Sequence, residues 1–307
     1  MIEIFEFFFF TVEMADREKE GTASICGMLT LYFPPESLFT NIATYIDYID
    51  KLFVVDNSLD CNNTLHKELL LLYPDVEIVA SGENIGIAGA LNLCISVAKK
   101  ENYQWMLTMD QDSYFDEIQA SRYFDSLQVI DHARVAIVSP SHEEVGSGID
   151  CCVYEKKDTV MTSGNLLNLS SVGKIGMFNE DLFIDCIDHD YCLRAKLLGF
   201  DVLQAKNCFI QHEVGTPYSG SFFLGVMKRK FHIHSPRRMY FIVRNSLYMN
   251  KKYRKAFPEY VRIHNKEVLH KISKTLRYGN HRALYVQYVI KGCFDYYLNK
   301  YGNRVGI

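Results

Sequence analysis

Residues 105–113 read WMLTMDQDS, a short apolar run followed by two aspartates that are one residue apart. A run of this length and composition is typical of a buried strand. On an extended segment alternate side chains point to the same side, so Asp110 and Asp112 can share one hard divalent cation, which prefers oxygen ligands. A loop or helix-capping pair is the competing interpretation. The position of the pair directly after the run favours a metal site at the carboxyl end of a central strand.

Strand-like and helix-like segments alternate on both sides of this run. Apolar runs cover residues 23–32, 51–55, 76–80, 105–109 and 135–139, and helical patterns cover 36–46, 64–72, 86–100 and 117–130. Strands separated by such helices form βαβ units, which predict an α/β fold with a doubly wound, mostly parallel sheet. After residue 141 the alternation loosens, and we expect strands at 159–168 and 201–212 and a helix at 188–199.

Polar side chains follow three of these strands at the point where each strand ends. Asp56 and Asn57 follow the second strand, Asn84 follows the third, and the Asp-Gln-Asp tripeptide follows the fourth. In open α/β sheets ligands bind at the carboxyl ends of the strands. We therefore expect these side chains to line one site.

Charge is distributed unevenly along the chain. Residues 228–307 hold 19 Lys and Arg against three acidic residues, a net charge of +16, which leaves −20 on residues 1–227 for the total of −4. The basic end predicts an anionic partner, either a membrane surface or a phosphorylated ligand. Nucleic acid is disfavoured, because the acidic body repels a second polyanion. A solvated basic face without a partner remains an alternative.

The pattern divides the chain into three regions. We expect an N-terminal extension or linker at 1–21, a ligand-binding domain at 22–226 and a basic, tyrosine-rich helical region at 227–307. Helical periodicity in 261–277 and 282–298 supports the last of these. Basic helices rich in aromatic residues suit a membrane interface, although the same rings serve equally to pack helices onto the core or onto a second subunit.

The nine cysteines form no Cys-X-X-Cys pair and have no regular spacing. They predict free, partly buried thiols in a reducing compartment, which indicates a cytoplasmic protein. The cysteines and histidines of residues 186–212 have the wrong spacing for a zinc finger. The run Phe7–Phe10 is too short to span a bilayer. Any membrane contact is therefore expected to be peripheral, at the inner face of the cell membrane.

Three segments resemble family 2 glycosyltransferases of the GT-A fold, namely residues 54–58 (VVDNS), 83–92 (ENIGIAGALN) and 105–113. The form Asp-Gln-Asp-Ser, preceded by Asn-Ile-Gly-Ile-Ala, resembles the bacterial rhamnosyltransferase branch in particular. The likeness runs from about Ile25 to Tyr253. It implies that residues 22–226 form a GT-A nucleotide-sugar-binding and catalytic domain, with a Rossmann-like mixed sheet and a C-terminal helical extension.

The resemblance also implies roles for the residues at the strand ends. Asp56 is expected to hydrogen-bond the nucleotide base or its neighbourhood, and Asn84 with the Gly86 backbone to pack near the nucleoside. Asp110 and Asp112 are expected to face the ribose and the metal–diphosphate unit, with Mg²⁺ or Mn²⁺ as the cofactor. For Asp56 and Asn84 an ordinary role in a turn remains the alternative.

Sugar transfer with inversion in one step needs a carboxylate that takes the proton of the acceptor hydroxyl. Residues 183–194 (FIDCIDHDYCLR) resemble the acidic motif of the family at the start of a helix. The resemblance makes Asp188 the base, with Asp185 and Asp190 as supporting groups. Asp185 as the base, and a purely helix-capping Asp188, remain alternatives.

Two further elements belong to the expected site. His212 follows a strand, where the family often has a histidine close to the metal or the diphosphate; a structural imidazole is the alternative. Residues 237–245 (RRMYFIVRN) resemble the Arg-Tyr-Tyr…Arg-Asn stretch of the rhamnosyltransferase branch. On a helix Tyr240, Arg244 and Asn245 share one face. We expect Arg244 to clamp the diphosphate, Asn245 to bind the sugar donor and Tyr240 to support them.

The implied activity is transfer of L-rhamnose from dTDP-L-rhamnose to a glycan or polyprenyl-diphosphate-linked acceptor, in the synthesis of a surface polysaccharide such as O-antigen or capsule. A homo-oligomer is left open. The same chemistry with a UDP-sugar donor (N-acetylglucosamine, galactose or glucose) is the alternative within the class. A catalytically silent protein that binds a nucleotide sugar is the alternative from another class.

Overall fold

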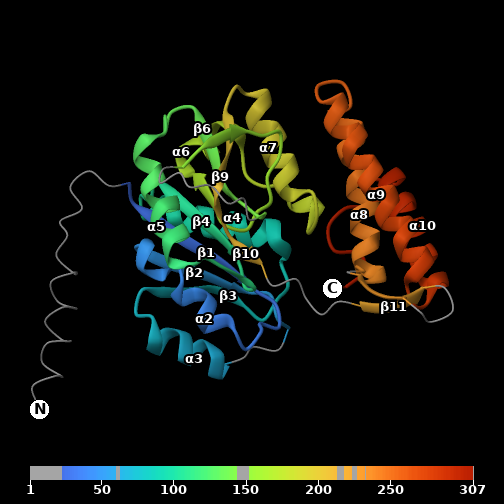
Figure 1. Ribbon diagram of the computed structural model, residues 1–307, viewed down its shortest axis with the longest axis horizontal. Helices are drawn as coiled ribbons and strands as arrows, with labels where there is room; N and C mark the ends of the chain where they lie inside the picture. Colours follow the sequence, from blue (N-terminus) through green and yellow to red (C-terminus); the bar gives the residue numbers. More distant parts are fainter. Residues whose placement is uncertain are drawn as a thin grey trace, which may run out of the picture.

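The computed structural model describes residues 23–59, 63–143, 152–212, 218–222, 227–231 and 233–306. The predicted N-terminal extension at 1–21 lies outside these residues. The described chain has an α/β fold in which one large sheet is covered by helices on both faces and is followed by three long C-terminal helices (Figure 1). The predicted fold class is therefore confirmed.

The sheet has eight strands in the order β3-β2-β1-β4-β8-β6-β9-β7. Neighbouring strands are parallel except where β8 lies between β4 and β6 and where β7 pairs with β9 at the edge. The strands are β1 (Ile25–Leu31), β2 (Lys51–Asp56), β3 (Val76–Ser81), β4 (Trp105–Asp110), β6 (Val135–Ser141), β7 (Tyr154–Lys156), β8 (Asn165–Asn168) and β9 (Asp201–Phe209). β4 is an inner strand, as its apolar run predicts.

Both faces of the sheet are covered, because residues of its inner strands enter two different hydrophobic clusters, one on each face. On β1, Cys26 and Met28 belong to the cluster that packs under α4, α6 and α7, whereas Leu29 and Leu31 belong to the cluster under α2, α3 and α5. These helices are α2 (Leu38–Ala43), α3 (Asn63–Leu72), α4 (Gly86–Lys100), α5 (Glu117–Asp125), α6 (Leu169–Ile175) and α7 (Ile187–Leu197).

The C-terminal helices α8 (Pro236–Tyr253), α9 (Pro258–Tyr278) and α10 (Arg282–Tyr297) lie beside the sheet domain (Figure 1). Met249 and Tyr253 of α8 are fully buried in the same cluster as α4 and α7, so the helices are packed onto the sheet domain. The hairpin of β11 (Tyr218–Phe222) and β12 (Met227–Phe231) extends across the predicted boundary at 226/227. Within the described ranges, none of the helices is long and apolar enough to cross a membrane.

Two predicted segments end earlier than the sequence indicates. The expected strand at 201–212 breaks at Ile210, whose N–H donates to the Ser141 carbonyl at 2.9 Å. Beyond the break, β10 (Gln211–His212) pairs with β5 (Ser113–Tyr114) in a separate two-stranded sheet. The expected helix at 117–130 continues beyond α5 as a 3₁₀ turn at Ser126–Val129.

The prediction that the cysteines are free thiols is wrong for one pair. Cys152 and Cys208 form a disulfide, although they are 56 residues apart in the chain. The antiparallel pairing of β7 with β9 brings the two positions together, because Tyr154 lies opposite Ala205. No local spacing in the sequence reveals this pairing.

Candidate active site

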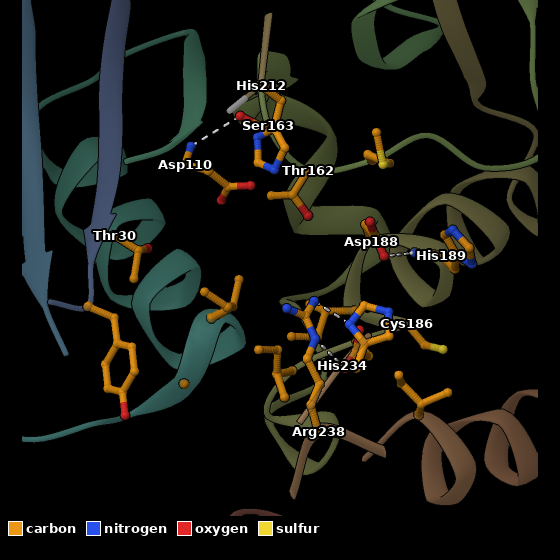
Figure 2. A pocket seen from close by; sticks show the side chains of 18 of the residues that line it. Thr30, Asp110, Thr162, Ser163, Cys186, Asp188, His189, His212, His234 and Arg238 are labelled. Carbon is orange, nitrogen blue, oxygen red and sulfur yellow. Dashed lines mark hydrogen bonds and ion pairs between the residues drawn. The ribbon is translucent and has the colours of Figure 1, made fainter. Parts of the chain in front are cut away.

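A cavity of about 510 Å³ opens at the carboxyl ends of β1, β2 and β4. Its opposite wall consists of the first turn of α7 and of pocket-facing residues on α8 and α9. Asp110 and His212 point into the cavity from one side, and Asp188 and Arg238 from the other (Figure 2). Asn57, Asn84 and Asp110 at the strand ends and Asp188 of the α7 motif therefore line one cavity.

Asp110, Asp112 and His212 form a cluster in which one ligand atom of each residue lies within 4.8 Å of the others. The pairing of β10 with β5 produces this arrangement, because it sets His212 opposite Ser113. His212 Nδ1 lies 2.8 Å from the Ser113 hydroxyl and 3.3 Å from Asp112 Oδ1. Between the two aspartates, Gln111 points away and exchanges hydrogen bonds with the Tyr32 backbone at 2.8 and 3.0 Å.

The chemistry of this cluster fits a divalent cation. Burial, together with the charge of the neighbouring Asp112 carboxylate, raises the pKa of Asp110 to about 6. Two carboxylates this close repel each other, and a shared cation removes that repulsion. Carboxylate oxygens are suitable ligands for Mg²⁺ or Mn²⁺, and an additional imidazole nitrogen favours the transition metal Mn²⁺.

The loop before α4 contributes Asn84 to the pocket wall, and Gly86, the first residue of α4, also lines it. The side-chain oxygen of Asn84 accepts a hydrogen bond from Gly86 N at 3.0 Å, and that of Asn57 accepts one from Ile85 N at 3.1 Å. Gly86 has φ +74°, and a Cβ there would lie 2.6 Å from the ring of Phe183. The position therefore requires glycine for two independent reasons, its backbone conformation and its close approach to Phe183.

Replacing Gly86 by Ala is expected to lower the free energy of unfolding by about 1–3 kcal/mol, since it adds both backbone strain and a clash. Thermal unfolding measures this loss. Gly173→Ala is the matched control, because an added Cβ there meets nothing within 4 Å. We expect the control to be neutral or slightly stabilising. Equal losses in both variants would contradict the close-approach argument.

The structure places the Asp56 carboxylate among protein partners. Its side chain is 1% exposed and is not among the pocket-lining residues. One carboxylate oxygen accepts from Ser58 N at 2.9 Å and the other lies 2.8 Å from His66 Nε2. The neighbouring Asn57 lines the pocket instead.

Asp188 lines the pocket from the first turn of α7. It is not the N-cap of this helix, because Cys186 occupies that position without a side-chain cap. The Asp188 carboxylate accepts a hydrogen bond from His189 N at 2.8 Å. Among the hydrogen bonds and ion pairs of the described residues, Asp188 has no cationic partner. Its carboxylate faces the cavity and is free to accept a proton, as a general base requires.

The two supporting aspartates differ in position. Asp185 lines the pocket and forms an ion pair with Arg238 at 3.2 Å, which raises the pKa of Arg238. Asp190 is fully buried and lies outside the pocket lining. Its carboxylate binds Lys252 Nζ at 2.7 Å and Tyr253 OH at 2.8 Å, so it ties α7 to α8.

The structure places Arg244, Asn245 and Tyr240 away from the pocket. All three are fully buried, and none is among the residues that line the cavity. Arg244 Nη1 donates to the Gly302 carbonyl at 2.6 Å, and the Tyr240 hydroxyl donates to Asp295 at 2.8 Å. The three residues do share one side of α8, but that side faces the protein interior. In this conformation the Arg244 guanidinium therefore lies in the protein interior, where it binds backbone carbonyls.

Several pocket residues were not predicted from the sequence. Ser163 accepts a hydrogen bond from Asp110 N at 3.1 Å, and burial lowers the pKa of His142 to about 4. From α9 the pocket receives His264, Glu267 and Lys271, which have helical spacing. Their spacing is the only local feature of the sequence that groups these three residues. It does not show whether their side of α9 faces the cavity or solvent.

Comparison with known proteins shows what the sequence and the fold of this chain are similar to. Residues 36–147 match Glycosyl transferase family 2. The dTDP-rhamnosyl transferase RfbF of Shigella flexneri is 27% identical over 219 residues, which are 65% of this chain and 70% of that protein. A crystal structure of GalNAc-T7 with UDP, GalNAc and Mn²⁺ superposes with a TM-score of 0.57 at 11% identity.

That superposition covers 92% of this chain but only 57% of the GalNAc-T7 chain, and at this identity it shows a shared fold alone. The family match spans β2, β3 and β4 together with the Asp-Gln-Asp tripeptide. Over residues 36–147 the chain is therefore similar to glycosyltransferase family 2, and its fold is GT-A-like.

Proposed function

We propose that the protein is an inverting, metal-dependent rhamnosyltransferase that moves L-rhamnose from dTDP-L-rhamnose onto a hydroxyl of a glycan acceptor. The observation that carries this proposal is the meeting of Asp110, Asp112 and His212 with Asp188 in one cavity. The likeness to the rhamnosyl transferase of Shigella flexneri supports the choice of sugar.

Each part of the cavity has a role in this proposal. Asp110, Asp112 and His212 hold the divalent cation, which when bound neutralises charge on the departing nucleoside diphosphate. Asn84 and Gly86 shape the wall beside the nucleoside. Asp188 accepts the proton of the acceptor hydroxyl as that hydroxyl attacks the anomeric carbon from the side opposite the leaving group.

Turnover of a panel of sugar nucleotides with Mn²⁺ tests this proposal. We expect release of dTDP from dTDP-L-rhamnose, and no comparable turnover of UDP-N-acetylglucosamine, UDP-galactose, UDP-glucose or GDP-mannose. Preference for a UDP-sugar would keep the mechanism and overturn the choice of donor. Nucleotide binding without turnover of any donor would favour a catalytically silent binding protein.

We also propose that the acceptor is lipid-linked, as in bacterial surface polysaccharide synthesis, and that the protein works at the cytoplasmic face of the membrane. α10 presents an apolar stripe to solvent, with Val286, Ile290, Phe294 and Tyr297 exposed by 42%, 50%, 63% and 74%. The surrounding C-terminal region carries the excess of basic residues. This combination supports peripheral contact with an anionic membrane.

Sedimentation with lipid vesicles tests this contact. We expect binding to vesicles that contain anionic lipid, weakening as salt is added, and little binding to neutral vesicles. Dimerisation through the α10 stripe is the competing outcome, which light scattering detects as a doubled mass without vesicle binding.

A further inference from the structure

The backbone that leads into α7 is held in an unfavourable conformation. Phe183, Asp185 and Cys186 have φ values of 63°, 63° and 66°, in the left-handed region that residues other than glycine rarely adopt. Such backbone persists only where the surrounding structure over-determines it. Asp188 follows two residues after Cys186, so the position of its carboxylate depends on what fixes this segment.

One buried amide holds most of the segment. Asn245 Nδ2 donates to three backbone carbonyls, those of Leu182 at 2.9 Å, Ile184 at 2.7 Å and Asp185 at 2.9 Å. The Oδ1 atom of Asn245 accepts from Arg244 Nε at 3.0 Å, which orients the amide. Both N–H groups of the Asn245 amide therefore bind the strained segment.

Arg244 binds the residues just before the segment 183–186. Its Nη2 atom donates to the carbonyls of Asp181 at 2.9 Å and Leu182 at 3.1 Å. Its Nη1 atom donates to Gly302 near the C-terminus at 2.6 Å. The sequence indicated Arg244 and Asn245 as a binding element for the sugar donor. In the structure their side chains instead hydrogen-bond the backbone of residues 181–185.

The segment also touches the loop at the other side of the cavity. Ile87 N donates to the Phe183 carbonyl at 3.0 Å, and Gly86 leaves room for the Phe183 ring. The hydrogen bonds from Arg244 and Asn245 on α8 thus fix the backbone that leads into Asp188. They also fix its contact with the loop that contains Asn84.

We propose that Asn245, oriented by Arg244, is the positioning residue of the general base: it fixes the left-handed segment 183–186 so that the Asp188 carboxylate faces the cavity. This inference rests on the proposed role of Asp188. Asn245 does not touch the cavity and acts through the backbone alone.

Kinetics of Asn245→Ala test the proposal, with Asn250→Ala as the matched control. Asn250 lies farther along α8 and donates to Asn265 at 2.6 Å, away from the 181–186 segment. For Asn245→Ala we expect kcat for sugar transfer to fall about 10²-fold, because a small misplacement of the base is enough, while KM for the sugar donor changes less than about threefold. The control is expected to keep kcat within about threefold.

Asn245→Asp refines the test, because it keeps the shape of the side chain but turns the amide donor into an acceptor facing three carbonyls. We expect it to be as impaired as the alanine variant. If Asn245→Asp retains kcat, or if the Asn245→Ala and Asn250→Ala variants lose kcat equally, the positioning role is overturned. Should Asn245→Ala fail to fold, Arg244→Lys, which keeps the charge but reaches fewer carbonyls, replaces it.

Hydrogen exchange separates this inference from the proposed function. Peptides covering residues 181–188 are expected to exchange faster in Asn245→Ala than in the wild type, and unchanged in Asn250→Ala. Unchanged exchange in Asn245→Ala would contradict the claim that the hydrogen bonds of Asn245 fix this segment. If the wild type turns over no nucleotide sugar, the proposed function fails, yet the exchange result still decides whether Asn245 fixes the segment.

Discussion

Replacing Asp188 by Asn is expected to lower kcat for sugar transfer by about 10²–10⁴-fold, the usual contribution of a general base. The amide keeps the size of the side chain but cannot accept a proton from the acceptor hydroxyl. Affinity for the Mn²⁺–nucleotide complex should stay within a few-fold of the wild type, because Asp188 lies on the side of the cavity away from the metal cluster. Steady-state kinetics and calorimetric titration with Mn²⁺ and dTDP measure the two quantities.

Asp185→Asn is the matched control for this experiment, since Asp185 also lines the pocket but is paired with Arg238. We expect it to lose less than about tenfold in kcat, through a weaker hold on the segment before α7. A larger loss for Asp185→Asn than for Asp188→Asn would make Asp185 the base.

Asp110→Asn is expected to abolish the Mn²⁺-dependent binding of dTDP and to lower transfer by about 10³-fold or more, because it removes a charged metal ligand. The thermal stability of the metal-free protein should be unchanged or higher. Burial and the nearby Asp112 raise the pKa of Asp110, so its charged form is unfavourable in the free protein. Loss of binding together with retained or increased Tm separates a metal-site defect from misfolding.

Calorimetry and thermal unfolding with and without Mn²⁺ make this measurement, and treatment of the wild type with EDTA gives the corresponding metal-free reference. An Asp110→Asn variant that still gains stability from Mn²⁺ and dTDP would contradict the assignment of this cluster as the metal site.

The carboxylate pair of the candidate metal site could be predicted because its signals are local. Asp110 and Asp112 follow an apolar run directly, and parallel strands bring their carboxyl ends to one edge of the sheet. The strand-end rule placed Asn84 and Asn57 at the same edge, where both line the cavity. It did not separate Asp56 from Asn57, because the choice between neighbours depends on His66 and Ser58, which bind the Asp56 carboxylate.

The C-terminal helices show where sequence reasoning ends. Periodicity correctly put Tyr240, Arg244 and Asn245 on one side of a helix, yet it cannot say what that side faces. The packing of α8 against α10 and α7 turns them inward and leaves Arg238, two residues before Tyr240, beside the cavity. The Cys152–Cys208 disulfide was missed for a similar reason, since it depends on the pairing of β7 with β9.

The configuration of the sugar first released from the donor tests the central claim most directly. Time-resolved ¹H NMR of dTDP-L-rhamnose hydrolysis by the protein with Mg²⁺ follows the anomeric proton before the free sugar equilibrates, and needs no knowledge of the acceptor. A single displacement at this cavity predicts that the first anomer has the configuration opposite to that of the donor. Release of the anomer with the donor's own configuration would contradict the account.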